Sequence, residues 1–247
     1  MAEKTTRFEI KYRLNKAHAE AVVKWIANFM EPDAFGEGGS ASYSVHSLYL
    51  DDDDWSVYRD TRNGMFRRFK IRARTYGFTP KHNVFLEIKS RAGEAMWKSR
   101  VEVTRAEAIR LLRGEVVPNL RSSPQLEEFL AQRDLRNAVP KAWVTYRRDA
   151  WVGKDRETLV RVTFDSELAA APPTADLSEP PVWTLLPEVK DVVILELKYT
   201  HSYPPWIADL VRHFDIERKA MSKYRHAVDL LTEPPRRSKN TLYGGEL

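Results

Sequence analysis

The chain has 247 residues, of which 43% are hydrophobic, and it contains no cysteine. This hydrophobic fraction is enough to build a core, while the lack of cysteine excludes disulfides, thiolate nucleophiles and thiolate metal sites. The 40 Lys and Arg residues against 35 Asp and Glu residues give a net charge of +5, which favours a polyanionic partner. No apolar run is long enough to span a membrane and the first residues are polar, so we expect a cytoplasmic location.

The hydrophobic patterns predict strands and helices in a mixed order. Strands are expected at 7–14, 44–51, 65–76, 84–91, 96–103, 141–152, 159–168 and 192–199. Helices are expected after Asn15, from Thr104 to about Arg113, after Ser123, at 205–213 and at 222–231, with a short turn or helix at 52–62. Segments 31–42 and 169–181 are predicted loops. Residues 1–233 are expected to form one domain, followed by a disordered tail at 234–247.

Most of the predicted strands have one apolar face and one strongly charged face. The charged faces carry Arg68, Lys70, Arg72 and Arg74; Glu87, Lys89 and Arg91; Lys98, Arg100 and Glu102; Arg161, Asp165 and Glu167; and Glu196 with Lys198. One explanation is an open antiparallel sheet with helices on one face and water on the other. However, basic side chains at every second position of one strand repel each other unless an anion lies across them.

Curling of the strands into a barrel is the second explanation, and the one that we favour, because closure removes unpaired sheet edges. The predicted fold is then α+β, a closed antiparallel β-barrel with helices packed outside and charged faces lining the interior. Carboxylates mixed with Arg and Lys in such an interior indicate a ligand with many negative charges, together with a divalent cation.

Seven short motifs occur along the chain in a consistent order. They are Phe8-Glu9-Ile10-Lys11-Tyr12, Arg72-x-Arg74-x-Tyr76-Gly77, Leu86-Glu87-Ile88-Lys89, Tyr146-x-Arg148, Arg161-Val-Thr-Phe-Asp165, Leu195-Glu196-Leu197-Lys198 and Ser222-Lys223-Tyr224. Together they resemble the VTC (vacuolar transporter chaperone) domain, a polyphosphate polymerase of the triphosphate tunnel metalloenzyme, or CYTH-like, superfamily. The resemblance extends from about Arg7 to Leu231. It implies a closed tunnel that holds the phosphates of ATP among basic side chains, with Mn²⁺ or Mg²⁺ on a carboxylate.

The resemblance also implies the roles of individual residues. The catalytic phosphate ligands would be Lys11, Arg72, Arg74, Lys89, Arg148 and Lys223. Tyr146, Ser222, Lys198, Lys219 and Arg91 would bind substrate, and Glu196 would hold the metal ion. Arg7 stands where the superfamily signature Glu-x-Glu-x-Lys has its first Glu. This departure is expected of the VTC branch, and it argues against the plain hydrolases and cyclases.

The expected function is therefore that of an ATP-dependent, metal-dependent polyphosphate polymerase whose partners are ATP and polyphosphate. Phosphoryl transfer depends mainly on positioning and charge neutralisation, so guanidinium groups and a bridging metal suffice without a protein nucleophile. Two alternatives remain: a triphosphatase or cyclase of the same superfamily, and a non-catalytic module that binds polyphosphate or nucleic acid. Nucleic-acid binding is disfavoured because the aromatic residues fall mostly on the faces opposite the basic ones. The carboxylate of Glu196 favours an enzyme, since an anion binder gains nothing from it.

Overall fold

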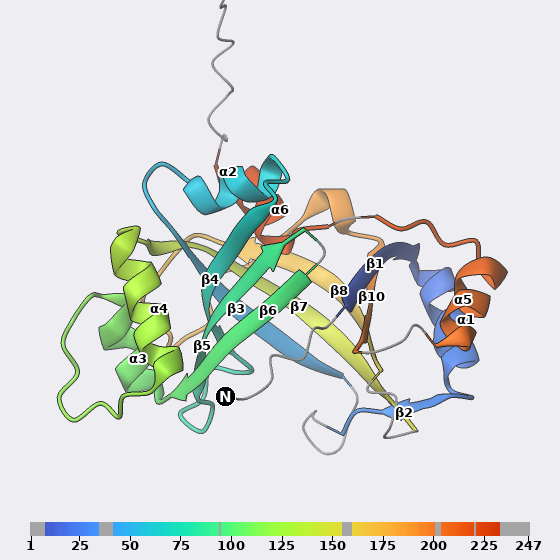
Figure 1. The fold of residues 1–247 in the computed structure, drawn as a ribbon, viewed down its shortest axis with the longest axis horizontal. Helices are drawn as coiled ribbons and strands as arrows, with labels where there is room; N and C mark the ends of the chain where they lie inside the picture. Colours follow the sequence, from blue (N-terminus) through green and yellow to red (C-terminus); the bar gives the residue numbers. More distant parts are fainter. Residues whose placement is uncertain are drawn as a thin grey trace, which may run out of the picture.

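A computed structural model of the chain describes residues 8–34, 42–93, 95–154, 160–200, 204–219 and 221–232. Arg7 and the predicted tail at 234–247 lie outside these ranges. The described residues form a mixed α+β fold, in which one large, curved antiparallel sheet carries helices on both of its faces (Figure 1).

The predicted strands and helices are all present, and the structure adds two short strands. The strands are β1 (Phe8–Asn15), β2 (Met30–Pro32), β3 (Ser42–Asp51), β4 (Arg67–Thr75), β5 (Val84–Ala92), β6 (Ala95–Val103), β7 (Val139–Gly153), β8 (Arg161–Ala171), β9 (Thr184–Leu185) and β10 (Val192–Tyr199). The helices are α1 (Lys16–Ile26), α2 (Ser56–Arg62), α3 (Arg105–Leu112), α4 (Pro124–Leu135), α5 (Pro205–His213) and α6 (Lys223–Leu231), with a 3₁₀ turn at Pro187–Val189. The short strand β2 begins just before a predicted loop, and β8 extends into another. Among the described residues, no helix is both long and apolar enough to span a bilayer.

Side-chain caps explain where three of the helices begin. The carboxamide oxygen of Asn15 accepts a hydrogen bond from the backbone N–H of His18, at 2.7 Å. Thr104 and Glu107 form a reciprocal capping box at the start of α3, and Ser123 caps α4 immediately before the proline at its first position. These caps satisfy backbone N–H groups that have no partner inside the helix, so the predicted helix starts are confirmed.

The sheet is not closed by backbone hydrogen bonds, so the prediction of a closed barrel is not confirmed. The strand order is β1-β10-β8-β7-β3-β4-β5-β6, with β2 on β7 and β9 on β8. Among the described strands β1 and β6 form the two ends of this order, and no ladder joins them. Side chains bridge the concave face instead, where Lys89 Nζ of β5 lies 2.8 Å from the carboxylate of Glu9 on β1.

Three apolar clusters determine which part of the sheet is charged and enclosed. Two of them lie on the convex face, one under α3 and α4 and one under α1 and α5. The third lies on the concave face, where α2 and α6 pack against β4, β7 and β8. These two helices occupy space that the side chains of a closed small barrel would fill, which explains why the strands curve around them without closing. The rest of the concave face is charged, and we call it the lumen.

Candidate phosphate-binding site

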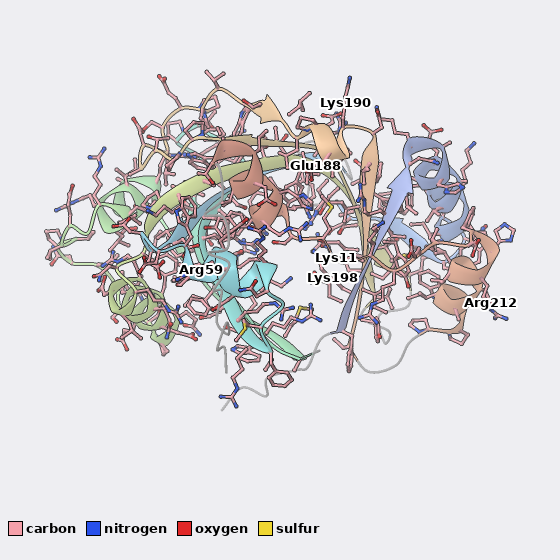
Figure 2. All side chains as sticks on the ribbon, turned by 90° about the horizontal axis from the view of Figure 1, so that it is seen from above. Lys11, Arg59, Glu188, Lys190, Lys198 and Arg212 are labelled. Carbon is pink, nitrogen blue, oxygen red and sulfur yellow. The ribbon has the colours of Figure 1, made fainter. Side chains whose placement is uncertain are left out.

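Strand alternation places basic side chains from five strands in the lumen. Lys11 comes from β1, Lys198 from β10, Arg148 from β7, Arg72 and Arg74 from β4, and Lys89 from β5. Lys223 is the first residue of α6. Figure 2 shows Lys11 and Lys198 near the middle of the molecule, whereas Arg212 of α5 lies at its outer surface. The structure thus brings together residues that are up to about 200 positions apart in the sequence.

Glu196 of β10 contacts four of these cations. Its Oε1 lies 2.8 Å from Lys11 Nζ and 3.1 Å from Lys223 Nζ. Its Oε2 lies 2.8 Å from Lys198 Nζ and 3.3 Å from Arg148 Nη2. Burial of this side chain favours the neutral acid, but the surrounding cations outweigh burial and hold the pKa of Glu196 well below its usual value. The carboxylate is therefore ionised and accepts from donors at both oxygens.

Asp165 of β8 is a second carboxylate in the same cluster, and it was not among the predicted site residues. It is fully buried and receives two charge-assisted hydrogen bonds from Arg148, at 2.6 and 2.7 Å. Lys223 Nζ lies 2.6 Å from its Oδ2. Burial opposes ionisation, yet Arg148 and Lys223 lower the pKa of Asp165. Asp165 thus fixes both cations where they reach Glu196.

Glu87 of β5 supplies the anion that the row of basic residues on β4 requires. Its Oε2 accepts from Arg72 Nε at 2.8 Å and lies 3.8 Å from Arg74 Nη1, while its Oε1 lies 2.5 Å from Lys98 Nζ. The side chain is fully buried, and these cations lower the pKa of Glu87 in spite of that burial. Glu87 thus relieves the repulsion between Arg72 and Arg74 without an external anion.

Glu9 of β1 is the fourth inward-facing carboxylate, and it joins two strands that share no ladder. Both of its oxygens accept from Lys89, at 3.1 and 2.8 Å, and Lys11 Nζ lies 3.2 Å away. Burial raises the pKa of Glu9, but the two lysines lower it further than burial raises it. We call Glu9, Glu87, Asp165 and Glu196 the inner carboxylates. Apart from Glu196 none was predicted as a site residue, although each belongs to a motif that resembles the family.

Two tyrosines mark the border between the lumen and the apolar cluster under α6. The hydroxyl of Tyr146 accepts from Arg74 at 3.4 Å, and Lys223 Nζ lies 4.6 Å from the centre of its ring. The hydroxyl of Tyr49 accepts from Arg72 at 3.0 Å, and its ring stacks on Tyr224 of α6. These contacts fix the direction of both guanidinium groups, because each tyrosine is held in a packed cluster.

Four other predicted positions lie at the margins of this cluster. The hydroxyl of Ser222 accepts from the backbone N–H of Arg225 and caps α6, which orients Lys223. Lys219 is exposed, and its backbone N–H donates to the carbonyl of Lys11. Arg91 lies near the end of β5 and donates to the carbonyl of Gly93. Glu167, expected on the charged face beside Asp165, is instead exposed, because a left-handed φ of 54° interrupts the alternation of β8.

Replacement of Arg74 by Ala is expected to weaken binding of tripolyphosphate by about one to two decades, since a desolvated charge-assisted contact contributes roughly 1.5–3 kcal/mol. Stability should change little, because Glu87 keeps Arg72 and Lys98 as closer partners. Calorimetric titration measures the affinity. Arg110→Ala, which removes an exposed ion pair with Glu115, is the control. A large fall in melting temperature with unchanged affinity would identify Arg74 as a structural residue.

Glu196 and Thr163 are oxygen donors that this part of the lumen offers to a divalent ion. Hard oxygen ligands suit Mg²⁺ and Mn²⁺, and Mg²⁺ is commonly held by one or two carboxylates together with substrate phosphates. Thr163 of β8 lies directly across from Glu196 in the ladder, and its buried hydroxyl has no hydrogen-bond partner among the described residues. No group of three His, Asp or Glu side chains suited to a metal occurs in the described part of the chain. These residues fit an ion that shares its coordination with phosphate oxygens.

Comparisons with solved structures give a likeness in fold. No curated protein matches the sequence significantly. Among solved structures, a proposed adenylate cyclase from Bacillus halodurans is similar, with a TM-score of 0.51 and 11% identity over 87% of this chain and 93% of that one. The PH1819 protein from Pyrococcus horikoshii OT3 gives a TM-score of 0.48 and 12% identity over 91% and 99% of the two chains. At these identities the likeness concerns the fold alone.

The sequence itself gives the more specific result. The family model described as "VTC domain" matches residues 6–232, which includes all the strands and helices described above. A phosphate-related function in a basic interior is consistent with this match and with the cations gathered around the inner carboxylates. The chain belongs to the VTC domain family.

Proposed function

We propose that the protein is an ATP-dependent polyphosphate polymerase, which transfers the terminal phosphate of ATP to a growing chain of phosphates. The observation that carries the proposal is the group of four cations around the buried Glu196, in a chain of the VTC family: Lys11, Arg148, Lys198 and Lys223. These cations are already gathered around one carboxylate before any ligand arrives, so they provide positive charge close to a bound polyanion. They suit phosphoryl transfer, which needs positioning and neutralisation more than it needs a protein nucleophile.

Binding of a triphosphate to these residues is an exchange of partners. Phosphate oxygens accept hydrogen bonds from Lys11 and Lys223, which leave Oε1 of Glu196 as they turn toward the ligand. Glu196 would hold a divalent ion at this site, together with oxygens of the bound phosphates. When bound, such an ion would neutralise the charge that develops on the transferred phosphate. Arg148 stays fixed by its two hydrogen bonds to Asp165.

The transfer step is balanced without a proton from the protein. A terminal oxygen of the phosphate chain attacks the γ-phosphorus of ATP, a new P–O bond forms, and the bond from that phosphorus to the bridging β,γ-oxygen breaks. ADP leaves with that oxygen, and the chain is one phosphate longer. Arg72 and Arg74 are held by Glu87 and the two tyrosines. In the proposed reaction they would bind the equatorial oxygens of the transferred group.

The length of the basic row favours a polymerase over a triphosphatase. Basic side chains face the lumen at every second position of β4, from Arg68 to Arg74. At about 3.3 Å per residue, this row extends about 20 Å, which is more than one triphosphate needs. A second polyanion can therefore lie in line with the bound nucleotide.

An assay of products tests the proposal. Purified protein with ATP and Mn²⁺ or Mg²⁺ is expected to form long phosphate chains, visible on a gel that resolves them, and added short polyphosphate should stimulate growth. Orthophosphate as the sole product, with both metals and with primer supplied, would contradict the proposal and indicate a triphosphatase.

A further inference from the structure

Asp51, the last residue of β3, is a fully buried carboxylate that is not one of the inner carboxylates. Its Oδ1 accepts from the backbone N–H groups of Asp52 and Val57, each at 2.9 Å. Its Oδ2 accepts from the backbone N–H of Tyr58 at 2.9 Å and from the hydroxyl of Tyr224 at 2.7 Å. These four donors are neutral, whereas the inner carboxylates contact cations. Burial of a carboxylate is costly unless it is hydrogen-bonded, so the four bonds fix Asp51 in one position.

The bond from Tyr224 connects Asp51 to the first turn of α6. An ionised carboxylate can only accept, so the hydroxyl of Tyr224 is the donor. Tyr224 directly follows Lys223, and these two residues begin the helix. Lys223 Nζ lies 2.6 Å from Asp165 and 3.1 Å from Glu196. A shift of this turn would therefore move the ammonium group away from both carboxylates.

The aromatic ring of Tyr224 is held independently of its hydroxyl. It is fully buried and stacks on Tyr49 of β3, with the ring centres 4.8 Å apart. Removal of the hydroxyl alone leaves this stacking in place and leaves Asp51 with its three backbone donors. The contribution of the Tyr224–Asp51 bond can thus be measured without loss of the packed ring.

We propose that Asp51 is a positioning residue of the phosphate-binding site. It acts through the hydroxyl of Tyr224, which holds the start of α6 where Lys223 reaches both Asp165 and Glu196. Asp51 contacts the start of α2 and the tyrosine, so its effect on a ligand passes through Lys223. This role rests on the proposed function only for a chain of phosphates as the ligand, and binding of tripolyphosphate tests it without turnover.

Replacement of Tyr224 by Phe tests the role of the hydroxyl. We expect the dissociation constant of tripolyphosphate to rise about five- to tenfold, because Lys223 is held less firmly. Calorimetric titration well below the melting temperature measures this affinity on folded protein. Asp51→Asn should weaken binding at least as much, since it removes one of the acceptors. If Asp51→Asn does not fold, Tyr224→Phe decides.

Tyr58→Phe is the matched control. Tyr58 of α2 is also fully buried, and its hydroxyl donates to Asp229 in the last turn of α6, far along the helix from Lys223. Both changes remove one hydroxyl that binds a carboxylate, so the melting temperature should fall by similar amounts. Tyr58→Phe should nevertheless change the affinity for tripolyphosphate by less than about twofold. An equal loss of affinity in the two variants would overturn the positioning role.

A double-mutant cycle with Lys223→Met separates positioning from a general loss of stability. If Tyr224 acts through Lys223, then Tyr224→Phe should weaken binding by less than about twofold once Lys223 is already replaced. Losses of affinity that multiply in the double variant would contradict the proposal, as would a wild-type protein that binds no tripolyphosphate. Failure of the wild-type protein to make polyphosphate from ATP would refute the proposed function, while these affinities still decide the role of Asp51.

Discussion

Replacement of Glu196 by Gln is expected to lower turnover by about a hundredfold or more, which is the largest effect on activity that the site predicts. The change removes the carboxylate proposed to hold the divalent ion and leaves four cations without their shared counter-ion. It should therefore also destabilise the fold, by about 3 kcal/mol. Steady-state kinetics over a range of Mn²⁺ concentrations measure the first effect, and thermal unfolding measures the second.

Glu196→Asp separates the two roles of the carboxylate. It keeps the negative charge among the cations but withdraws the oxygens by one methylene, so stability should recover more than turnover does. Binding of Mn²⁺ in the presence of tripolyphosphate, followed by electron paramagnetic resonance, gives a readout that does not depend on activity. Near-normal turnover in Glu196→Gln with an unchanged metal requirement would rule out Glu196 as the metal ligand.

Replacement of Asp165 by Asn is expected to produce the largest loss of stability, about 3–5 kcal/mol, because it leaves Arg148 and Lys223 buried with too little negative charge. For a domain of this size, the melting temperature should fall by roughly 10 °C. Asp209→Asn is the matched control, since Asp209 lies in an exposed ion pair on α5 and should contribute less than about 1 kcal/mol. Equal effects of the two changes would contradict a structural role for Asp165.

The loss of stability in Asp165→Asn should depend on pH, and this dependence gives a second check. The pKa of Asp165 is lower in the folded protein than its ordinary value of 3.8, so its contribution is complete above that value and is lost as the pH falls through the folded-state pKa. The gap in unfolding free energy between the wild-type protein and Asp165→Asn should thus be constant near neutral pH and narrow in strong acid. A difference in unfolding free energy that widens in acid would contradict a lowered pKa of Asp165 in the folded protein.

Strand alternation predicted much of the site, and the reason is physical. Where one face of a strand must be apolar, every second residue belongs to the other face, and this places Arg72, Arg74 and Lys89 on the charged face without knowledge of the fold. The order of the motifs then predicted the family, which the match over residues 6–232 confirms.

The partners of these cations could not be predicted in the same way. Which carboxylate faces Arg72 depends on the register between β4 and β5, and the contact of Glu9 with Lys89 depends on the curvature of the whole sheet. The bulge that turns Glu167 outward leaves no mark in the hydrophobic pattern. The prediction of backbone closure is not confirmed among the described strands. It treated every helix as external, whereas α2 and α6 pack on the concave face.

The inner carboxylates have a consequence for discrimination between ligands. Each lysine or arginine around Glu196 already has an anionic partner, so a single orthophosphate gains little when it replaces one carboxylate contact with another. A linked chain of phosphates meets several cations at once, and after the first exchange its remaining groups are held at high local concentration. If the proposed function holds, the inner carboxylates would disfavour binding of small anions, and the lumen would select its ligands by chain length.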